Sequence, residues 1–133
     1  IMPAHGVKIV YTNSCIPQER VDSEDGTYKW YLDSDCSKKM SGRCEPTATI
    51  ANNKTYYKPE ATASGSANIE SLSDINFVYI KNTGDNDLTI NIGGRGARIL
   101  LGPDESFAAE ILSTSVAVAS TSGTTYEYFV GID

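Results

Sequence analysis

The stretch "DLTINIGGRGARILLGPDESF", residues 87–107, decides how the chain folds. It opens with alternating apolar and polar side chains, which place Leu88, Ile90 and Ile92 on one face, as in a half-buried strand. Three glycines and two arginines follow, and then a short apolar run that a Gly-Pro pair stops. The glycines could therefore either cradle a phosphate or turn one strand back on the next.

The glycine pattern does not fit a nucleotide-binding loop. A dinucleotide fingerprint needs GxGxxG between a strand and a helix, but Ile99 stands where the third glycine would follow Gly94 and Gly96. The GK[ST] of a phosphate-binding loop is also missing after these glycines. We therefore predict a hairpin corner, in which glycines can take positive φ, and we take the corner's Arg95 and Arg98 as candidate interface residues.

The same alternation extends on both sides of this stretch. "INFVYIKN" is apolar on both faces, which is typical of a covered central strand, and "TYEYFVGI" places Tyr126, Tyr128 and Val130 together. The loops "NTGDND" and "STSGTT" are predicted to join neighbouring strands as short hairpins. Consecutive short strands with tight loops indicate an all-β fold, an antiparallel sandwich or a jelly-roll-like barrel. The expected strands are 75–82, 87–93, 97–101, 105–111, 115–120 and 124–132.

The first half of the chain is less regular. "GVKIVYTN", "TYKWYLDS" and "TATIANNKTYYK" could each form a strand, whereas "PQERVDSEDG" and "DSDCSKKMSGRCEP" have the polar composition of long exposed loops. Residues 58–74 are rich in Ser, Ala, Gly and Glu, which is typical of a linker or an extended arm. We therefore expect a loop-rich β portion over 1–57, a crossing segment over 58–74 and an antiparallel β-sandwich over 75–133.

The charge distribution excludes some partners. Residues 61–133 hold three Lys or Arg against nine Asp or Glu and supply the whole net charge of −6. An acidic domain repels phosphate backbones, so we expect no nucleic-acid binding. Apolar runs also stay far below the roughly 20 residues that a membrane-spanning helix needs, so we expect no membrane insertion.

Catalytic, cofactor and metal sites are not predicted. The acidic pairs at 33/35, 85/87 and 104/105 lie in turns, where Asp is favoured because its side chain bonds the local backbone. Calcium at "GDND" or "DSD" is an alternative, although a complete EF-hand loop is missing. His5 is the single histidine, and no GxSxG elbow is present, so nucleophilic catalysis lacks its usual groups.

The three cysteines leave several states open. Cys36 and Cys44 could close a short disulfide loop and leave Cys15 unpaired, or all three could be unlinked thiols. Zinc bound by the cysteines and His5 is a third alternative, but the CxxC pairs that usually build such a site are missing.

The aromatic residues of the first half are candidates for recognition. "YKWYL" and "TYYK" mix Tyr, Trp and Lys, and such residues stack on sugars or anchor protein interfaces. Trp30 is expected in a hydrophobic core, because large aromatics are mostly buried. Tyr31, Tyr56 and Tyr57 are the better interface candidates.

The C-terminal stretch "FVYIKNTGDNDLTINIGGRGARILLGPDESFAAEI…VAVASTSGTTYEYFVGI" resembles a pattern of small structural proteins of tailed bacteriophages. In that pattern an "IxNxG" strand leads into an "L.PGESF"-like turn, and a "v.v.S..GT..veY.v" segment closes the sandwich. The turn of this chain has Asp104 where glycine is commoner. The resemblance covers about residues 75–132.

The resemblance implies a non-enzymatic virion component, such as a capsid decoration (cement) protein, a head fibre or a tail accessory protein. Its partners would be capsid or tail proteins of the same virion, and it would form a homo-oligomer. The alternative is an extracellular carbohydrate-binding, adhesin or filament module, in which Tyr31, Tyr56 and Tyr57 with a calcium site would carry recognition.

Overall fold

The computed structural model describes residues 6–12, 18–32, 46–51, 55–69 and 72–132. The chain divides into two compact units, of which the smaller is Val10–Thr47 and the larger combines Ile1–Ile9 with Ala48–Asp133. Strands β1 (Gly6–Val10) and β4 (Thr47–Ala51) pair as a separate two-stranded sheet. Within the described ranges, no helix is long and apolar enough to cross a bilayer.

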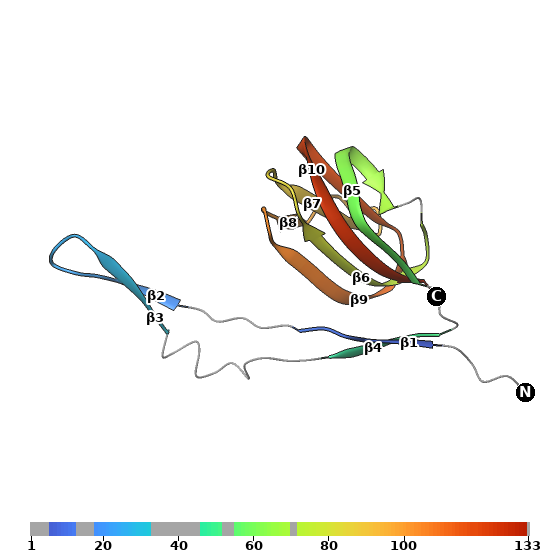
Figure 1. Ribbon diagram of the computed structural model, residues 1–133, viewed down its shortest axis with the longest axis horizontal. Helices are drawn as coiled ribbons and strands as arrows, with labels where there is room; N and C mark the ends of the chain where they lie inside the picture. Colours follow the sequence, from blue (N-terminus) through green and yellow to red (C-terminus); the bar gives the residue numbers. More distant parts are fainter. Residues whose placement is uncertain (1–5, 13–17, 33–45, 52–54, 70–71, 133) are drawn as a thin grey trace, which may run out of the picture. The chain divides into compact units, whose positions relative to one another are not determined.

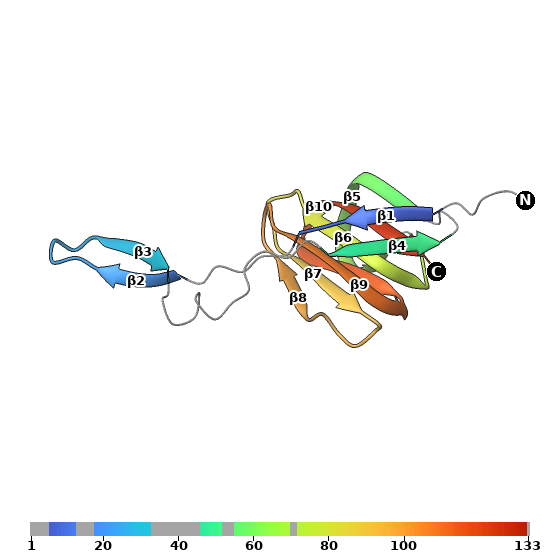
Figure 2. The same cartoon turned by 90° about the horizontal axis from the view of Figure 1, so that it is seen from below.

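The smaller unit contains the hairpin of β2 (Gln18–Asp22) and β3 (Tyr28–Leu32) (Figure 2). Its turn is closed by Asp25, whose Oδ1 accepts hydrogen bonds from the Thr27 hydroxyl at 2.6 Å and the Thr27 amide at 3.1 Å. These bonds hold the pKa of Asp25 below its ordinary value. The prediction of a loop over "PQERVDSEDG" is wrong for β2, because pairing with β3 supplies backbone bonds that polar composition does not reveal.

The larger unit is built on one antiparallel six-stranded sheet (Figure 1). The strand order is β8-β7-β10-β6-β9, and β5 pairs with the other edge of β10. The sheet curls into a nearly closed barrel-like sandwich, which confirms the predicted all-β antiparallel fold. Its strands are β5 (Thr55–Asn68), β6 (Ile75–Asn82), β7 (Leu88–Ile92), β8 (Ile99–Leu101), β9 (Ser106–Thr114) and β10 (Val116–Ile132).

Strand β10 passes through both layers of the sandwich. Residues 116–119 pair with β7, and residues 126–132 pair with β6. Between them the register with β5 shifts at Ser120/Thr124, where Gly123 has a φ of 82°. Because a bulge bends a strand and increases its twist, β10 and β5 turn the corner together, and their pairing resumes at Thr124 and Ala63.

The core fills the space between the two layers. Leu88, Ile90, Val116 and Val118 point inward from the β7 layer and are at most 1% exposed. Tyr128, Val130, Val78 and Ile80 meet them from the β6 layer. Burial of each apolar side chain of this size stabilises the folded state by roughly 1.5–3 kcal/mol. The alternating residues that the sequence predicts to face inward therefore supply much of the free energy of folding.

Two predicted hairpins are wrong. "STSGTT" lies inside β10, because both halves of that strand continue along β5. "NTGDND" joins β6 to β7, but these strands pair with different halves of β10 and not with each other. Glycine, serine and threonine favour a bulge or a layer crossing as readily as a hairpin, so the local composition does not separate them. The "GGRG" corner between β7 and β8 is a hairpin turn as predicted, with positive φ at its three glycines.

The composition-based prediction of a linker or extended arm is wrong for residues 58–68. They belong to β5, which is paired along β10 from Thr55 to Asn68. Ala63 is 1% exposed within the core, and Ala61 packs against it. Small side chains fit here because β10 bends close by, so a composition typical of linkers also suits this strand.

Asn82, the last residue of β6, forms hydrogen bonds to the loop after β6, to β8 and to β10. Its side chain is fully buried. The Nδ2 group donates to the carbonyl oxygens of Asn86 at 2.7 Å and Leu101 at 2.9 Å, and Oδ1 accepts from the Gly84 amide at 3.1 Å and the Thr124 hydroxyl at 2.9 Å. All four hydrogen-bonding positions of the amide are therefore occupied.

Candidate interaction surface

An aromatic row crosses the outer face of the β6 layer. Tyr57 on β5 lies directly opposite Phe129 on β10, and Phe129 lies directly opposite Tyr79 on β6. All three side chains point outward, because the residues next to them in β6 and β10, such as Val78 and Val130, point into the core. We call Tyr57, Phe129 and Tyr79 the aromatic row.

The row is exposed at one end and supported at the other. Tyr57 is 61% exposed, whereas Phe129 and Tyr79 are half-buried. Phe77 is 1% exposed and packs edge-to-face against Phe129, with 6.2 Å between the ring centroids. Such a contact adds about 0.5–1.5 kcal/mol beyond the buried area, so it holds the Phe129 ring in place.

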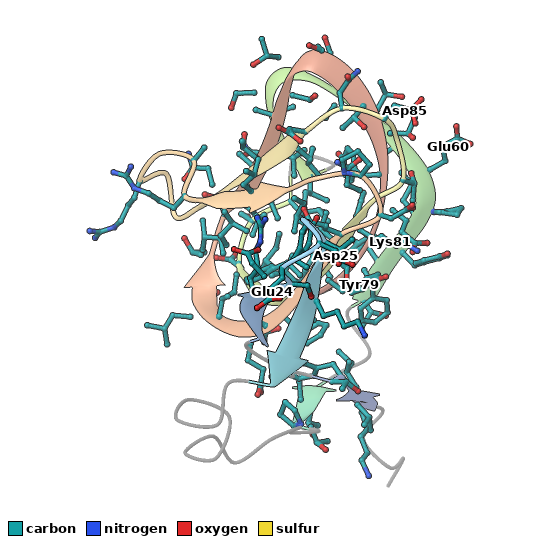
Figure 3. All side chains as sticks on the ribbon, turned by 90° about the vertical axis from the view of Figure 1, so that its left-hand side faces the viewer. Glu24, Asp25, Glu60, Tyr79, Lys81 and Asp85 are labelled. Carbon is teal, nitrogen blue, oxygen red and sulfur yellow. The ribbon has the colours of Figure 1, made fainter. Side chains whose placement is uncertain are left out.

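A charged pair borders the row. Glu127 and Lys81 lie opposite each other on β10 and β6, and Figure 3 shows Lys81 beside Tyr79 on β6. The Tyr79 hydroxyl donates a hydrogen bond to Glu127 Oε1 at 3.2 Å. Burial, followed by the negative charge of Glu127 and this hydrogen bond, raises the pKa of Tyr79 above its ordinary value, and Tyr57 adds to the effect. The phenol is therefore protonated at neutral pH and fixed in direction.

The predicted interface tyrosines have different positions. Tyr57 belongs to the aromatic row, whereas its neighbour Tyr56 lies opposite Val130 on the other face of β5 and is 51% exposed. Tyr31 is in β3, opposite Glu19, but its side chain lies outside the described residues, as does that of Trp30. Cys36 and Cys44, with Cys15 and His5, also lie outside the described residues.

The predicted arginines lie at the β7–β8 corner. The Arg95 amide donates to Asn91 Oδ1 at 2.9 Å, and the Arg98 amide donates to the Ile90 carbonyl oxygen at 3.1 Å. Both residues are exposed. The backbone bonds close a tight turn, and the guanidinium groups extend from it.

The acidic turns do not gather into a metal centre among the described residues. Asp85 and Asp87 line a cleft of about 450 Å³ beside β10, but no described group of three or more His, Cys, Asp or Glu could hold a metal ion.

The sequence alone indicates Tyr57 as an interface residue but does not indicate its two partners. Tyr79 and Phe129 lie in strands as predicted, and the apolar outer face of "INFVYIKN" is the available signal. That signal predicts a covered strand, whereas Tyr79 is only half-buried. The row forms from three strands that are distant in sequence, so its existence depends on the register of β5 with β10.

The aromatic row can hold a flat apolar partner, and the flanking carboxylate and amine can orient it. No protein-family model, no curated protein and no solved structure matches this chain.

Proposed function

We propose that the chain is a non-enzymatic structural protein of a bacteriophage virion and attaches to a capsid or tail lattice through the aromatic row. Two things support this: the resemblance of residues 75–132 to small structural proteins of tailed bacteriophages, and the exposed tyrosine on a rigid sheet. The position of Tyr57, 61% exposed beside supported aromatic rings, carries the proposal.

The row has the properties of an interface anchor. Tyrosine brings a large contact area with few rotatable bonds, so little conformational entropy is lost when a partner covers it. Phe129 and Tyr79 are already held by Phe77 and Glu127, so the surface needs no rearrangement on binding. A lattice presents the same docking site many times, so a homo-oligomer gains affinity through multivalency.

The test is co-sedimentation of purified chain with virion shells of the phage whose genome encodes it. Tyr57→Ala should weaken binding about 30-fold, which corresponds to about 2 kcal/mol for an interface anchor. Tyr56→Ala is the matched control, because it removes a tyrosine of similar exposure from the neighbouring position and the opposite face. Both variants should keep the wild-type melting temperature.

Two results would overturn the proposal. One is the failure of the wild-type chain to sediment with shells, together with its absence from mass spectra of purified particles. The other is an equal loss of binding in both tyrosine variants, which would remove the aromatic row from the attachment surface.

A glycan-binding module is the second candidate. An exposed tyrosine ring can stack on the apolar face of a sugar, and Glu127 and Lys81 lie close enough in the sheet to bond its hydroxyls. A glycan array, run with and without a chelator, separates the two functions. Sugar binding that Tyr57→Ala abolishes would favour this module over lattice attachment.

A further inference from the structure

A polar cleft opens on the outer face of the β7 layer, on the opposite side of the core from the aromatic row. Its volume is about 450 Å³. Its floor contains Thr89 and Ala119, which lie opposite each other on β7 and β10. Asp85, Asn86 and Asp87 line it from the loop before β7, Leu100 from β8, and Ser120 from β10.

The cleft is a preformed acidic site. The Asn86 Nδ2 group donates to the Gly123 carbonyl oxygen at 2.8 Å, and the Ser120 hydroxyl donates to the Asp87 carbonyl oxygen at 2.7 Å. These bonds attach the loop that carries Asp85 and Asp87 to the bend of β10. The lining residues include two carboxylates and no cationic side chain, so the cleft favours a cationic occupant.

Two exposed arginines lie at the β7–β8 corner, at the other end of β7 from the cleft. Leu100 is opposite Thr89 in the β7–β8 pairing, and Arg98 directly precedes β8, where its amide donates to the Ile90 carbonyl oxygen. Arg95 and Arg98 are two of only three Lys or Arg in residues 61–133. In the described part of the chain the one ion pair joins Arg20 and Asp22, so neither arginine is paired with a carboxylate of that part.

The face is therefore basic at one end of β7 and acidic at the other. Asp87 precedes β7 and the β7–β8 corner follows it, so the two ends are separated by roughly 17–20 Å along the strand. Between them the residues are small or short, such as Thr89, Ala117 and Ala119, so a second face can approach closely. Leu100, which is 63% exposed, would be covered by that approach.

We propose that the occupant of the cleft is a second copy of this chain, which places its Arg95 and Arg98 against Asp85 and Asp87. A two-fold axis in the plane of the face turns the basic end of one copy over the acidic end of the other. Each contact then occurs twice, as in an isologous dimer. One chain carries both the basic and the acidic end, so each end finds its complement on a second copy, and we favour a second copy over an unrelated partner.

This inference goes beyond lattice attachment. The self-association face, defined by the cleft, Leu100, Arg95 and Arg98, lies on the β7 layer, whereas the aromatic row lies on the β6 layer. The Tyr57→Ala variant should therefore still dimerise. Evidence against lattice attachment through the aromatic row would not contradict self-association through the β7 layer, and the reverse also holds.

The test is a charge exchange followed by sedimentation equilibrium of the full chain. Wild-type protein should have twice the 14.3 kDa of one chain. The variants Arg95→Glu/Arg98→Glu and Asp85→Arg/Asp87→Arg should each dissociate at least 100-fold more readily, because like charges then face each other. An equimolar mixture of the two variants should form a heterodimer, because both contacts regain opposite charges. Circular dichroism checks that each variant is folded.

Several results would overturn the proposal. These are a monomeric wild-type chain at about 100 µM, variants that dimerise like wild type, and a mixture that stays monomeric. Oligomers larger than a dimer would exclude the two-fold arrangement. The measurement is repeated in EDTA and in calcium chloride, and dissociation by EDTA would assign the cleft to a cation instead of a second copy.

Discussion

Substitution of Asn82 by aspartate tests the hydrogen-bond network that joins the two layers. The side chains have nearly the same shape, so the substitution changes hydrogen bonding and charge with little effect on packing. The carboxylate still accepts from the Gly84 amide and the Thr124 hydroxyl. It cannot donate to the Asn86 and Leu101 carbonyl oxygens, and its second oxygen faces both of them at close range.

The cost follows from the two carbonyl groups that lose their donor. A buried polar group left without a partner costs about 1–3 kcal/mol, and a partly exposed one costs less. The bond to Leu101 is buried and the bond to Asn86 is part-buried, so we expect the free energy of unfolding to fall by about 2–4 kcal/mol at pH 7. A domain is typically stable by about 5–15 kcal/mol, so this is a large fraction of the total. Repulsion between the carboxylate and the carbonyl oxygens acts in the same direction.

The loss should depend on pH. Burial and the facing carbonyl groups raise the folded-state pKa of the new carboxyl group above its unfolded value of about 3.9, because its neutral form can donate one hydrogen bond. The folded state of Asn82→Asp therefore binds a proton more tightly than the unfolded state. Its stability relative to wild type is greatest below the unfolded pKa and is lost as pH rises through the folded pKa.

Urea unfolding followed by circular dichroism, at several pH values between 4 and 8, measures this difference. Asn86→Asp is the control, because it makes the same chemical change at an exposed side chain, which donates to the Gly123 carbonyl oxygen. We expect the control to lose less than about 1 kcal/mol. The reasoning would be refuted if Asn82→Asp also lowered the free energy of unfolding by less than about 1 kcal/mol, or if its loss stayed constant from pH 8 to pH 4.

Three further predictions test other parts of the larger unit. Gly84→Ala brings a Cβ within 2.7 Å of the β10 backbone, so the free energy of unfolding should fall by about 2–4 kcal/mol; an unchanged urea midpoint would contradict the close approach. Ala63→Glu places an unpaired carboxylate in the core and should cost about 3 kcal/mol or more, whereas Ser64→Glu on the exposed side should cost under about 0.5 kcal/mol. Equal urea midpoints for these two variants would contradict the assignment of 58–68 to a core strand. Glu127→Gln should lower the pKa of Tyr79, measured by NMR titration of labelled tyrosines, while burial keeps it above the ordinary value. Because that pKa is raised in the folded state, its contribution to stability is lost as pH rises above about 10, and Glu127→Gln should reduce this alkaline loss. A pKa that does not move would remove the influence of Glu127.

The strands of the C-terminal half could be predicted because their signal is local. The alternation in residues 88–92 and 126–132 places apolar side chains on one face, and burial of that face fixes the strand. The "GGRG" corner could also be predicted, since a turn with positive φ favours glycine over other residues.

The pairing partners could not be predicted because they are not local. Nothing within "STSGTT" distinguishes a turn between two strands from a bulge within one, since the difference lies in whether β5 continues alongside. The strand over 58–68 could not be predicted for the same reason. Its small residues have the composition of a linker, and they form a strand because β10 supplies their backbone hydrogen bonds. The candidate surface shared this limit. Tyr57 can be predicted from its residue type, but its neighbours Phe129 and Tyr79 follow from register alone.

The ribbon of β5 and β10 also links the two proposed surfaces. Ala119 forms part of the cleft floor, and Phe129, ten residues later on the same strand, is the centre of the aromatic row. Between them the register of β10 with β5 shifts twice, at Ser120/Thr124 and at Tyr126/Tyr128, and Thr124 at the first shift donates to the buried Asn82 side chain. The angle between the self-association face and the aromatic row is therefore set by one continuous, hydrogen-bonded ribbon. In the proposed dimer that fixed angle would hold two aromatic rows at a constant spacing, which is the geometry that bivalent attachment to a regular lattice requires.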